Sequence, residues 1–202
     1  MDKKLSAIVL AAGRGGRLGY PKIYAKFGEP ACRTGVEFFL ERIVNRIRSV
    51  GIQNVSVVTF PNCENNRFSV QCNWIINPDP ARGMLSSLYE GVKGSDNSDG
   101  YLIIPVDHPL VRIETLSRMK LSFESSACDV LKSRWNDRTG HPVIISKRVA
   151  DNIPSEDCEG GLNTFITDNK FTIEYVDVED EGIITNINTE SDLEEAIKRG
   201  RR

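Results

Sequence analysis

The feature that most restricts how this chain folds is a short apolar run that leads directly into a glycine-rich, cationic loop. Residues 7–10 are typical of a buried β-strand, and the segment that follows contains four glycines and three cations: Gly13, Gly15, Gly16, Gly19, Arg14, Arg17 and Lys22. Such a loop can bring backbone N–H groups and positive side chains against a polyphosphate. A flexible strand-to-helix connection with solvated arginines would have the same composition. Only the spacing of the glycines and cations can distinguish it from a phosphate-binding loop.

The spacing excludes the two commonest phosphate-binding loops. No Gly-x-x-x-x-Gly-Lys-Ser/Thr sequence can be aligned with this segment, which rules out a P-loop. If Gly13 begins a Gly-x-Gly-x-x-Gly fingerprint, the third glycine falls on Leu18, so a dinucleotide loop is excluded as well. The same mismatch disfavours a nicotinamide-dependent oxidoreductase.

Chain length and charge narrow the class of protein further. The chain has 202 residues, enough for one sizeable core and too few for two ordinary domains, so we expect a single domain over residues 1–202. Hydrophobic residues make up 40% and charged residues 27%, as in ordinary globular proteins. A formal net charge of −2 gives no reason to expect nucleic-acid binding by a basic surface.

The cysteines and the apolar segments bear on the compartment. Five cysteines are scattered, odd in number and without a Cys-x-x-Cys pair, which favours a reducing environment over a disulfide framework or a zinc knuckle. The N-terminus lacks the long apolar segment of a signal peptide, and no stretch approaches the length of a membrane span. We therefore expect a cytoplasmic protein with no membrane partner.

Apolar runs alternate with helical patterns along the chain, which predicts an α/β fold. Strands are expected at residues 7–10, 55–60, 74–76, 101–106, 130–134, 142–145, 173–178 and 183–187. Helices are expected at 36–50, 84–92, 113–123, 160–167 and 191–199, the last capped by Thr189 or Ser191. This order predicts a doubly wound, mostly parallel sheet, whose ligands bind beyond the carboxyl ends of the strands. The loops after Leu10, Ile76 and Val106 are therefore the expected site.

Those loops contain residues with suitable chemistry. Asp107 follows a central strand between Pro105 and Pro109, where a carboxylate suits a hard cation such as Mg²⁺ or merely caps the next helix. Ser86 and Ser87 lie in the first turn of an expected helix, suited to a base edge, an anion or simple capping. The residues alone leave these alternatives open.

The order Leu-Ala-Ala-Gly-x-Gly-x-Arg-Leu-Gly-x-Pro-Lys, from Leu10 to Lys22, resembles the nucleotide loop of the MobA-like nucleotidyltransferases, the sugar-phosphate and molybdenum-cofactor group. Residues 105–111 resemble the metal-aspartate motif of that family, and residues 186–193 resemble the segment that closes its active site. The resemblance runs from Leu10 to Leu193. It implies a Rossmann-like fold in which an acceptor phosphate attacks the α-phosphorus of an NTP and pyrophosphate leaves.

The resemblance also assigns roles. Arg17 would face the leaving pyrophosphate, Lys22 the α-phosphate, and Asp107 would hold Mg²⁺. Asn186 and Asn188 would lie near the metal and the acceptor, with Asn188 preferred as the metal-side oxygen, although Glu190 stands where the family usually has proline. The NTP would be wrapped by the loop and by the turn that meets the base: Leu10, Ala11, Ala12, Gly13, Gly15, Gly83 and Ser87, with Arg82 as a further candidate.

The substrates are implied less directly. Ala12 makes the loop Leu-Ala-Ala-Gly, which in the family accompanies pyrimidine nucleotides, so CTP is expected first and UTP second. The segment 140–142, Gly-His-Pro, favours molybdopterin as the phosphate-bearing acceptor, with a sugar or polyol phosphate as the competitor. Candidate acceptor contacts are His141, the turn at 160–163, and one of the cations Lys132, Arg134 and Arg138. A non-catalytic nucleotide-binding module is the alternative class, but its mark, a lost cation or a lost Asp107, is absent from the sequence.

Overall fold

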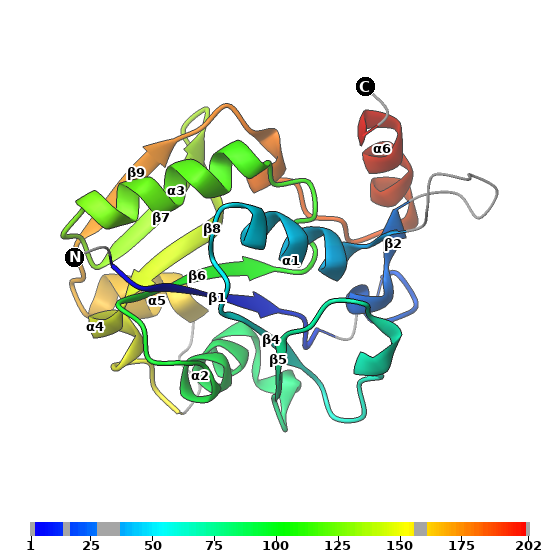
Figure 1. Ribbon diagram of the computed structural model, residues 1–202, viewed down its shortest axis with the longest axis horizontal. Helices are drawn as coiled ribbons and strands as arrows, with labels where there is room; N and C mark the ends of the chain where they lie inside the picture. The colour runs from blue at the N-terminus through cyan, green and yellow to red at the C-terminus, as the bar shows by residue number, and fades with distance from the viewer. Residues whose placement is uncertain (1–2, 14–16, 28–36, 156–160, 201–202) are drawn as a thin grey trace.

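The computed structural model describes residues 3–13, 17–27, 37–155 and 161–200. Seven strands form one sheet in the order β5-β4-β1-β6-β8-β7-β9 (Figure 1). Their bounds are Leu5–Leu10 (β1), Val55–Thr59 (β4), Asn73–Ile76 (β5), Gly100–Pro105 (β6), Val130–Trp135 (β7), Arg138–Ser146 (β8) and Ile173–Asp177 (β9). All neighbours pair in parallel except at β8, which is antiparallel to β6 and β7. The predicted mostly parallel α/β sheet is confirmed.

The centre of the sheet is apolar because both of its faces are covered. Every residue of β1 and β4 is buried, as is all of β6 but its last residue. In register, Leu10 pairs with Val58 of β4 and with Pro105 of β6. The chain segments that follow β1 and β6 therefore leave the sheet side by side at the same edge, where parallel α/β sheets bind their ligands.

Helices cover the two faces separately. Helices α1 (Phe39–Ser49) and α3 (Ile113–Ser125) pack on one face, and α2 (Met84–Gly94), α4 (Lys147–Ala150) and α5 (Gly161–Asp168) on the other (Figure 1). Helix α6 (Glu190–Gly200) closes the chain near the carboxyl ends of the strands. Helix α1 follows the predicted apolar spacing and stops before Gly51, which adopts a φ of 84° that favours glycine.

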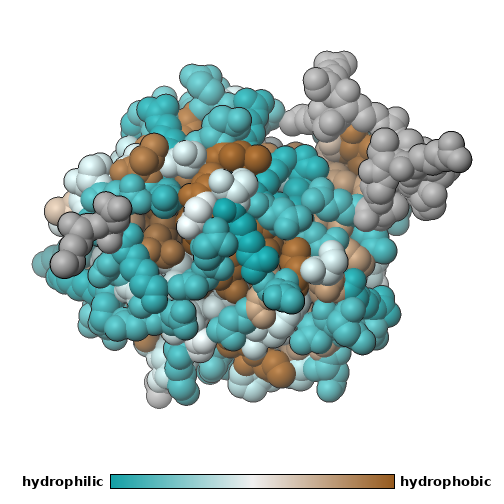
Figure 2. All heavy atoms as spheres, viewed as in Figure 1, coloured by the Kyte–Doolittle hydropathy of each residue, from teal (hydrophilic) through white to brown (hydrophobic). Residues whose placement is uncertain are grey.

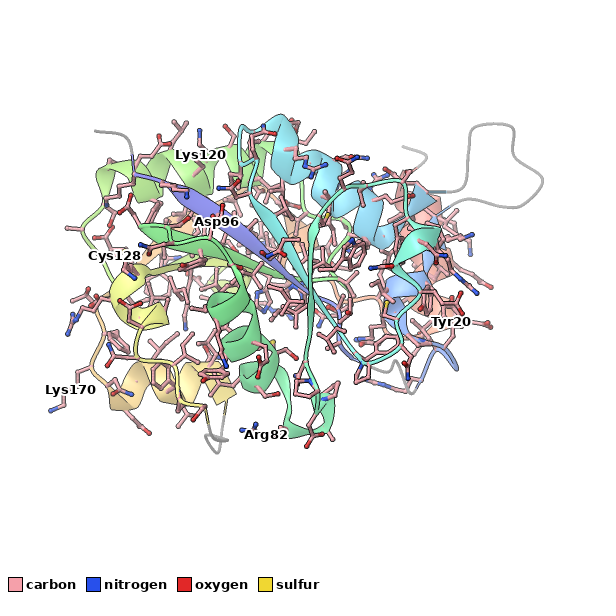
Figure 3. All side chains as sticks on the ribbon, turned by 60° about the horizontal axis from the view of Figure 1, so that its bottom comes forward. Tyr20, Arg82, Asp96, Lys120, Cys128 and Lys170 are labelled. Carbon is pink, nitrogen blue, oxygen red and sulfur yellow. The ribbon has the colours of Figure 1, made fainter. Side chains whose placement is uncertain are left out.

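Helix α2 lies unusually close to the sheet because Gly91 has no side chain. A Cβ atom at Gly91 would lie 2.7 Å from Cγ2 of Ile8 and 2.9 Å from Cγ2 of Val58, both of which are fully buried. Figure 3 shows α2 running across the strands, with Arg82 of the short helix η3 (Pro80–Arg82) at its outer end. The close approach places the C-terminal half of α2 directly against β1 and β4.

Two expectations about the second half of the chain need correction. Residues 183–187 are not a strand: the 3₁₀ turn η4 (Glu181–Ile183) is followed by a loop, and the Ile187 N–H donates to the backbone oxygen of Asp107 at 2.9 Å. The apolar pattern reflected burial, because Ile183 and Ile187 are both inaccessible to solvent. The strands expected at 130–134 and 142–145 extend further than predicted and meet in a tight hairpin, whose turn is Asn136 and Asp137, both at positive φ.

The distribution of apolar side chains on the surface and the length of the helices bear on membrane contact. On the face shown in Figure 2, apolar side chains lie in scattered groups among hydrophilic ones. Among the described residues, every helix is too short or too polar to cross a membrane.

Candidate active site

Three segments that are far apart in the sequence meet beyond the carboxyl ends of β1 and β6. Lys22 lies in the 3₁₀ turn η1 (Lys22–Tyr24), Asp107 lies two residues after the end of β6, and Asn188 precedes α6. The Nζ atom of Lys22 lies 2.6 Å from Oδ2 of Asp107 and also donates to Oδ1 of Asn188. The structure thus brings together three of the residues that the sequence predicts to act on the phosphates.

Asp107 is held in place by backbone hydrogen bonds on both sides. The N–H of Val106 donates to the backbone oxygen of Leu10, and the backbone oxygen of Asp107 accepts from Ile187. Its second carboxylate atom, Oδ1, is buried and has no hydrogen-bond partner in the described part of the chain, since Nε2 of His108 lies 3.9 Å away, beyond hydrogen-bond distance. A buried carboxylate oxygen without a partner is costly, which points to a ligand such as a cation at this atom.

Asn188 is oriented by the cap of α6. The backbone N–H groups of Asn188 and Thr189 both donate to Oδ2 of Asp192, at 2.9 and 2.8 Å, while the Thr189 hydroxyl accepts from the Asp192 N–H. The bond from Asn188 is the main reason that the pKa of Asp192 is lowered. Thr189, one of the two predicted caps, is the one used. This reciprocal cap holds the amide of Asn188 toward Lys22.

A first pocket of about 340 Å³ lies between the glycine-rich loop and α2. Its lining contains most of the predicted nucleotide and phosphate residues: Leu10, Ala12, Gly13, Arg17, Lys22, Gly83, Ser87, Asp107 and Asn188. Ala11 lies behind this wall, since its N–H donates to the backbone oxygen of Val58 and its methyl group packs in the core. Gly15 lies outside the described residues. The Arg82 guanidinium donates to the backbone oxygen of Ser155.

Asn77 lies behind this pocket's wall, against the lining residue Ser87, and the sequence interpretation did not single it out. Only 2% of Asn77 is exposed, and its Nδ2 donates to the hydroxyls of Ser86 (3.0 Å) and Ser87 (2.9 Å). The Ser86 hydroxyl in turn donates to the backbone oxygen of Gly83. Because the Ser87 oxygen accepts from Asn77, the Ser87 proton is left to donate into the pocket. An asparagine placed immediately after a strand, ahead of two serines, was the available clue.

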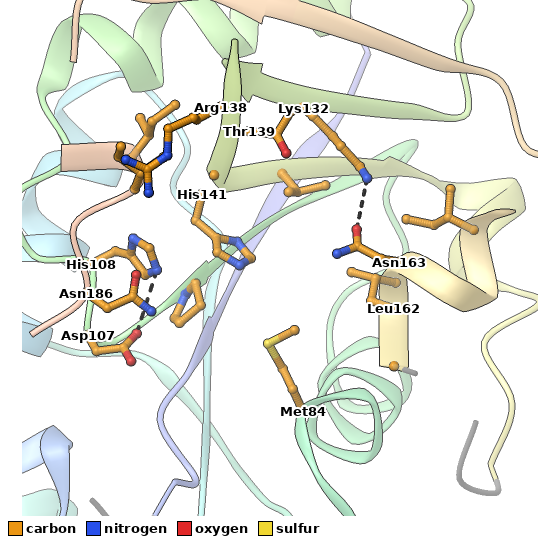
Figure 4. Close-up of a pocket in the computed structure, with 17 residues that line it drawn as sticks. Met84, Asp107, His108, Lys132, Arg138, Thr139, His141, Leu162, Asn163 and Asn186 are labelled. Atoms are coloured by element: carbon orange, nitrogen blue, oxygen red, sulfur yellow. Dashed lines mark hydrogen bonds and ion pairs between the residues drawn. The ribbon is translucent and has the colours of Figure 1, made fainter. Parts of the chain in front are cut away.

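A second pocket of about 500 Å³ adjoins the first (Figure 4). The two share Met84, Pro105 and Asp107 as a common wall. The predicted residues Asn186, His141, Lys132, Arg138 and Asn163 line the second pocket, so Asn186 lies on the opposite side of Asp107 from the glycine-rich loop. Two chambers that meet at one carboxylate suit a reaction between two substrates.

Two histidines lie in the wall of the second pocket. The rings of His108 and His141 are 5.0 Å apart and meet edge to face. Burial lowers the pKa of His108 and lowers that of His141 to about 4, so both rings are neutral at pH 7. The Nδ1 atom of each ring is buried without a hydrogen-bond partner in the described part of the chain. Neutral imidazoles offer such atoms as hydrogen-bond acceptors.

The donor atoms at this junction fit a divalent cation that substrates help to bind. Asp107 supplies a free buried carboxylate oxygen, and Asn188 and Asn186 supply amide oxygens on its two sides. In the described residues no three histidine, cysteine, aspartate or glutamate side chains form a metal-binding cluster. One carboxylate with amide and phosphate oxygens is a donor set typical of Mg²⁺.

Comparison with known proteins agrees with this geometry. The family model of the MobA-like NTP transferase domain matches residues 7–173. The chain belongs to the MobA-like NTP transferase family. The model describes an NTP transferase domain, which confirms the nucleotidyltransferase class predicted from the resemblance of the glycine-rich loop.

Individual MobA-like relatives are more distant. The nicotine blue oxidoreductase of Paenarthrobacter nicotinovorans is 25% identical over 194 residues, 92% of each chain. A probable molybdenum cofactor guanylyltransferase of Geobacillus sp. (strain WCH70) is 25% identical over 119 residues, 57% of this chain and 56% of that protein.

A solved structure shares the fold over nearly the whole chain. Rv0371c of Mycobacterium tuberculosis H37Rv superposes with a TM-score of 0.82 at 20% identity, covering 98% of this chain and 99% of that one. Its complex with manganese superposes with a TM-score of 0.76 at 18% identity, covering 98% and 100%. The fold assignment therefore stands independently of the family match.

Proposed function

We propose that this protein transfers a nucleoside monophosphate from an NTP to a phosphate-bearing small molecule and releases pyrophosphate, with Mg²⁺ as the metal and CTP as the preferred nucleotide. The observation that carries the proposal is the position of Asp107. This carboxylate lies on the wall shared by two pockets, and Lys22 contacts it from the nucleotide side. A reaction between two bound substrates needs both of them at one point.

The residues at the junction suit the electrostatics of nucleotidyl transfer. Both reactants are anions, so the barrier consists largely of charge repulsion and alignment. Lys22 would move from Asp107 to the α-phosphate and stabilise the charge that develops there, while Arg17 would meet the departing pyrophosphate. Mg²⁺ held by Asp107 and Asn188, when bound, supplies positive charge to the phosphates. A phosphate nucleophile is already ionised at neutral pH, so no protein base is required.

The Ser87 hydroxyl suits a nucleobase that presents a hydrogen-bond acceptor toward it. Asn77 leaves the Ser87 hydroxyl as a donor, and the pyrimidine O2 atom is an acceptor. Purines also present acceptor atoms to such a donor, so the preference for CTP, with UTP second, rests on Ala12 in the loop. For the acceptor we propose molybdopterin, and a sugar or polyol phosphate is the competitor. The similarity to a probable molybdenum cofactor guanylyltransferase supports the first of these.

Two assays test the proposal. Thermal unfolding is measured with CTP, UTP, GTP, ATP and NAD(P), each with Mg²⁺, and we expect the largest increase in Tm with CTP. Pyrophosphate release is then measured with CTP and each candidate acceptor, and release that depends on both substrates is expected. Stabilisation by NAD(P) alone would overturn the proposal, and nucleotide binding without pyrophosphate release would indicate a binding module.

A further inference from the structure

Lys132 is a charged residue at a position where the fold would otherwise place an apolar one. In β7 it lies two residues after the fully buried Val130, and it pairs with Val143 of β8. Directly paired residues lie on the same face of a sheet. Val130 and Val143 both belong to the apolar cluster that packs under α5, so Lys132 projects toward α5 at the edge of that cluster. A charge on an inner face carries a desolvation cost and calls for a compensating partner.

The partner that Lys132 has in the described part of the chain is neutral. Its Nζ atom donates to Oδ1 of Asn163 at 2.9 Å, and no carboxylate there lies within ion-pair distance. Burial alone lowers the pKa of Lys132, without any opposing carboxylate. The neighbouring cation Arg134 differs, because it forms two bonds with Asp177, at 2.6 and 3.0 Å. Among the candidate cations of the sequence, Lys132 is therefore a half-buried one without a counter-charge among the residues that the structure describes.

Lys132 also lies far from the reacting end of the pocket. Figure 4 shows His141 between the side that holds Asp107 and the side that holds Lys132 and Asn163. Val143 pairs with both Lys132 and Ile103, so Lys132 is two strands away from β6 and two residues short of Pro105. At the usual spacing of strands and residues, the Cα atoms of Lys132 and Pro105 are roughly 12 Å apart. Asp107 lies beyond Pro105, so a phosphate bound at Asp107 is too far away to contact Lys132 as well. Lys132 is therefore available to a different group of the same ligand.

Strand β7 also has a β-bulge at this point. The pairing of β7 with β8 changes register directly after Lys132, between Lys132 and Ser133. Such bulges are common beside active sites, where they redirect a side chain. Between the two ends the wall includes the apolar side chains of Met84, Leu162 and Ile166, while Arg138 lies on the side of His108 and Asn186 (Figure 4). The pocket therefore has a reacting end at Asp107, a partly apolar middle and a separate cation, Lys132, at its far end.

We infer that Lys132, supported by Asn163, is a specificity-determining residue that binds a second anionic group of the acceptor, remote from the phosphate that reacts at Asp107. The inference rests on the proposed function, since it takes the second pocket as the acceptor site. It deepens that function by naming the class of acceptor: a small molecule with an anionic group at each end of a largely apolar or neutral body.

Matched pairs of probes test this inference by titration calorimetry. Glucuronate 1-phosphate and glucose 1-phosphate differ only in the remote carboxylate, and so do 3-phosphoglycerate and glycerol 3-phosphate in a shorter body. In at least one pair we expect the wild-type protein to bind the carboxylate member about tenfold more tightly or better, as for a hydrogen bond between charged groups. Lys132→Met should abolish that preference, and Lys132→Arg should retain it.

A second variant separates recognition from a structural role. Asn163→Asp places a carboxylate beside Lys132, which has none among its described neighbours, so the chain should fold normally while the preference for the carboxylate member disappears. A wild-type protein without preference in either pair, or a preference that survives Lys132→Met, would overturn the inference. Mg²⁺–CTP binding is measured in parallel on every variant. If the wild-type protein binds no nucleotide, the result counts against the proposed function and not against the anion site.

Discussion

The Nζ atom of Lys22 lies 2.6 Å from Oδ2 of Asp107, although the two residues are 85 positions apart in the sequence. The side chains are only 19% and 14% exposed, so this pair is better shielded than a surface ion pair. Each charge neutralises the other until a substrate arrives. We expect the nucleotide phosphates and their metal to separate the pair, which makes the two residues a single unit in catalysis.

Replacing Lys22 is expected to lower turnover more than it lowers the affinity for the NTP. Lys22→Met should lower kcat by about 10²–10³-fold, because it removes an electrostatic contact to the developing charge. The KM for the NTP should change much less. Steady-state pyrophosphate release gives both values, with Lys26→Met as the control, since Lys26 is exposed and lies over the Phe38 ring. A rise in KM at unchanged kcat would make Lys22 a binder of the ground state.

Asn77 should act through Ser87. Asn77→Asp replaces the amide donor by an oxygen, so the Ser87 hydroxyl is expected to turn toward it and cease to donate to the base. The KM for CTP should rise by about tenfold, as expected for one lost hydrogen bond. Ser87→Ala should give a similar rise. The double variant should be no worse than either single variant, whereas additive effects would show that the two residues act independently.

Gly91 should be needed for the position of α2. Gly91→Ala places a Cβ atom 2.7 Å from Ile8 and 2.9 Å from Val58, which are fully buried and cannot yield easily. We expect the free energy of unfolding to fall by about 1–3 kcal/mol, as for other overpacked cores. Urea denaturation measures this change. Gly13→Ala is the matched control, because nothing lies within 4 Å of a Cβ at that position. Equal stability of the two variants would contradict the close packing.

His141 should make the fold sensitive to mild acid. Burial holds its pKa near 4, below the ordinary value of 6.5, so the unfolded chain takes up a proton before the folded one does. Stability should therefore be lost as pH falls from about 6.5 to 4, by about 2 kcal/mol between pH 7 and pH 5. Urea denaturation at the two pH values measures it. His141→Gln should lose less stability over the same interval, and an identical loss would exclude His141 as the cause.

The fold could be predicted largely because its signals are local. Buried parallel strands such as β1 and β6 are continuous apolar runs, and α1 shows one apolar stripe that ends before Gly51. The segment at 183–187 has the same apolar character for another reason. It is buried as a loop, tied to Asp107 by the Ile187 N–H, and composition does not distinguish that from a strand.

The grouping of the candidate site residues was predictable where each residue lies in a loop at the same edge of the sheet. The positions of Lys22, Asp107 and Asn188 follow from which loops leave the same edge of the sheet. The role of Asn77 depends on hydrogen bonds across a turn, and that of Lys132 on the absence of a carboxylate among its described neighbours. Such relationships arise only from packing, so the sequence left Lys132, Arg134 and Arg138 equivalent.

The most direct test of the account measures nucleotidyl transfer in the wild type and in Asp107→Asn. With Mg²⁺, CTP labelled at the α-phosphate and a candidate acceptor, the wild type should release one pyrophosphate for each label transferred. Asp107→Asn should fold normally and be slower by about 10²–10³-fold, because its amide no longer carries the charge at the junction. Transfer at an unchanged rate in this variant would contradict the central claim that both substrates react at Asp107.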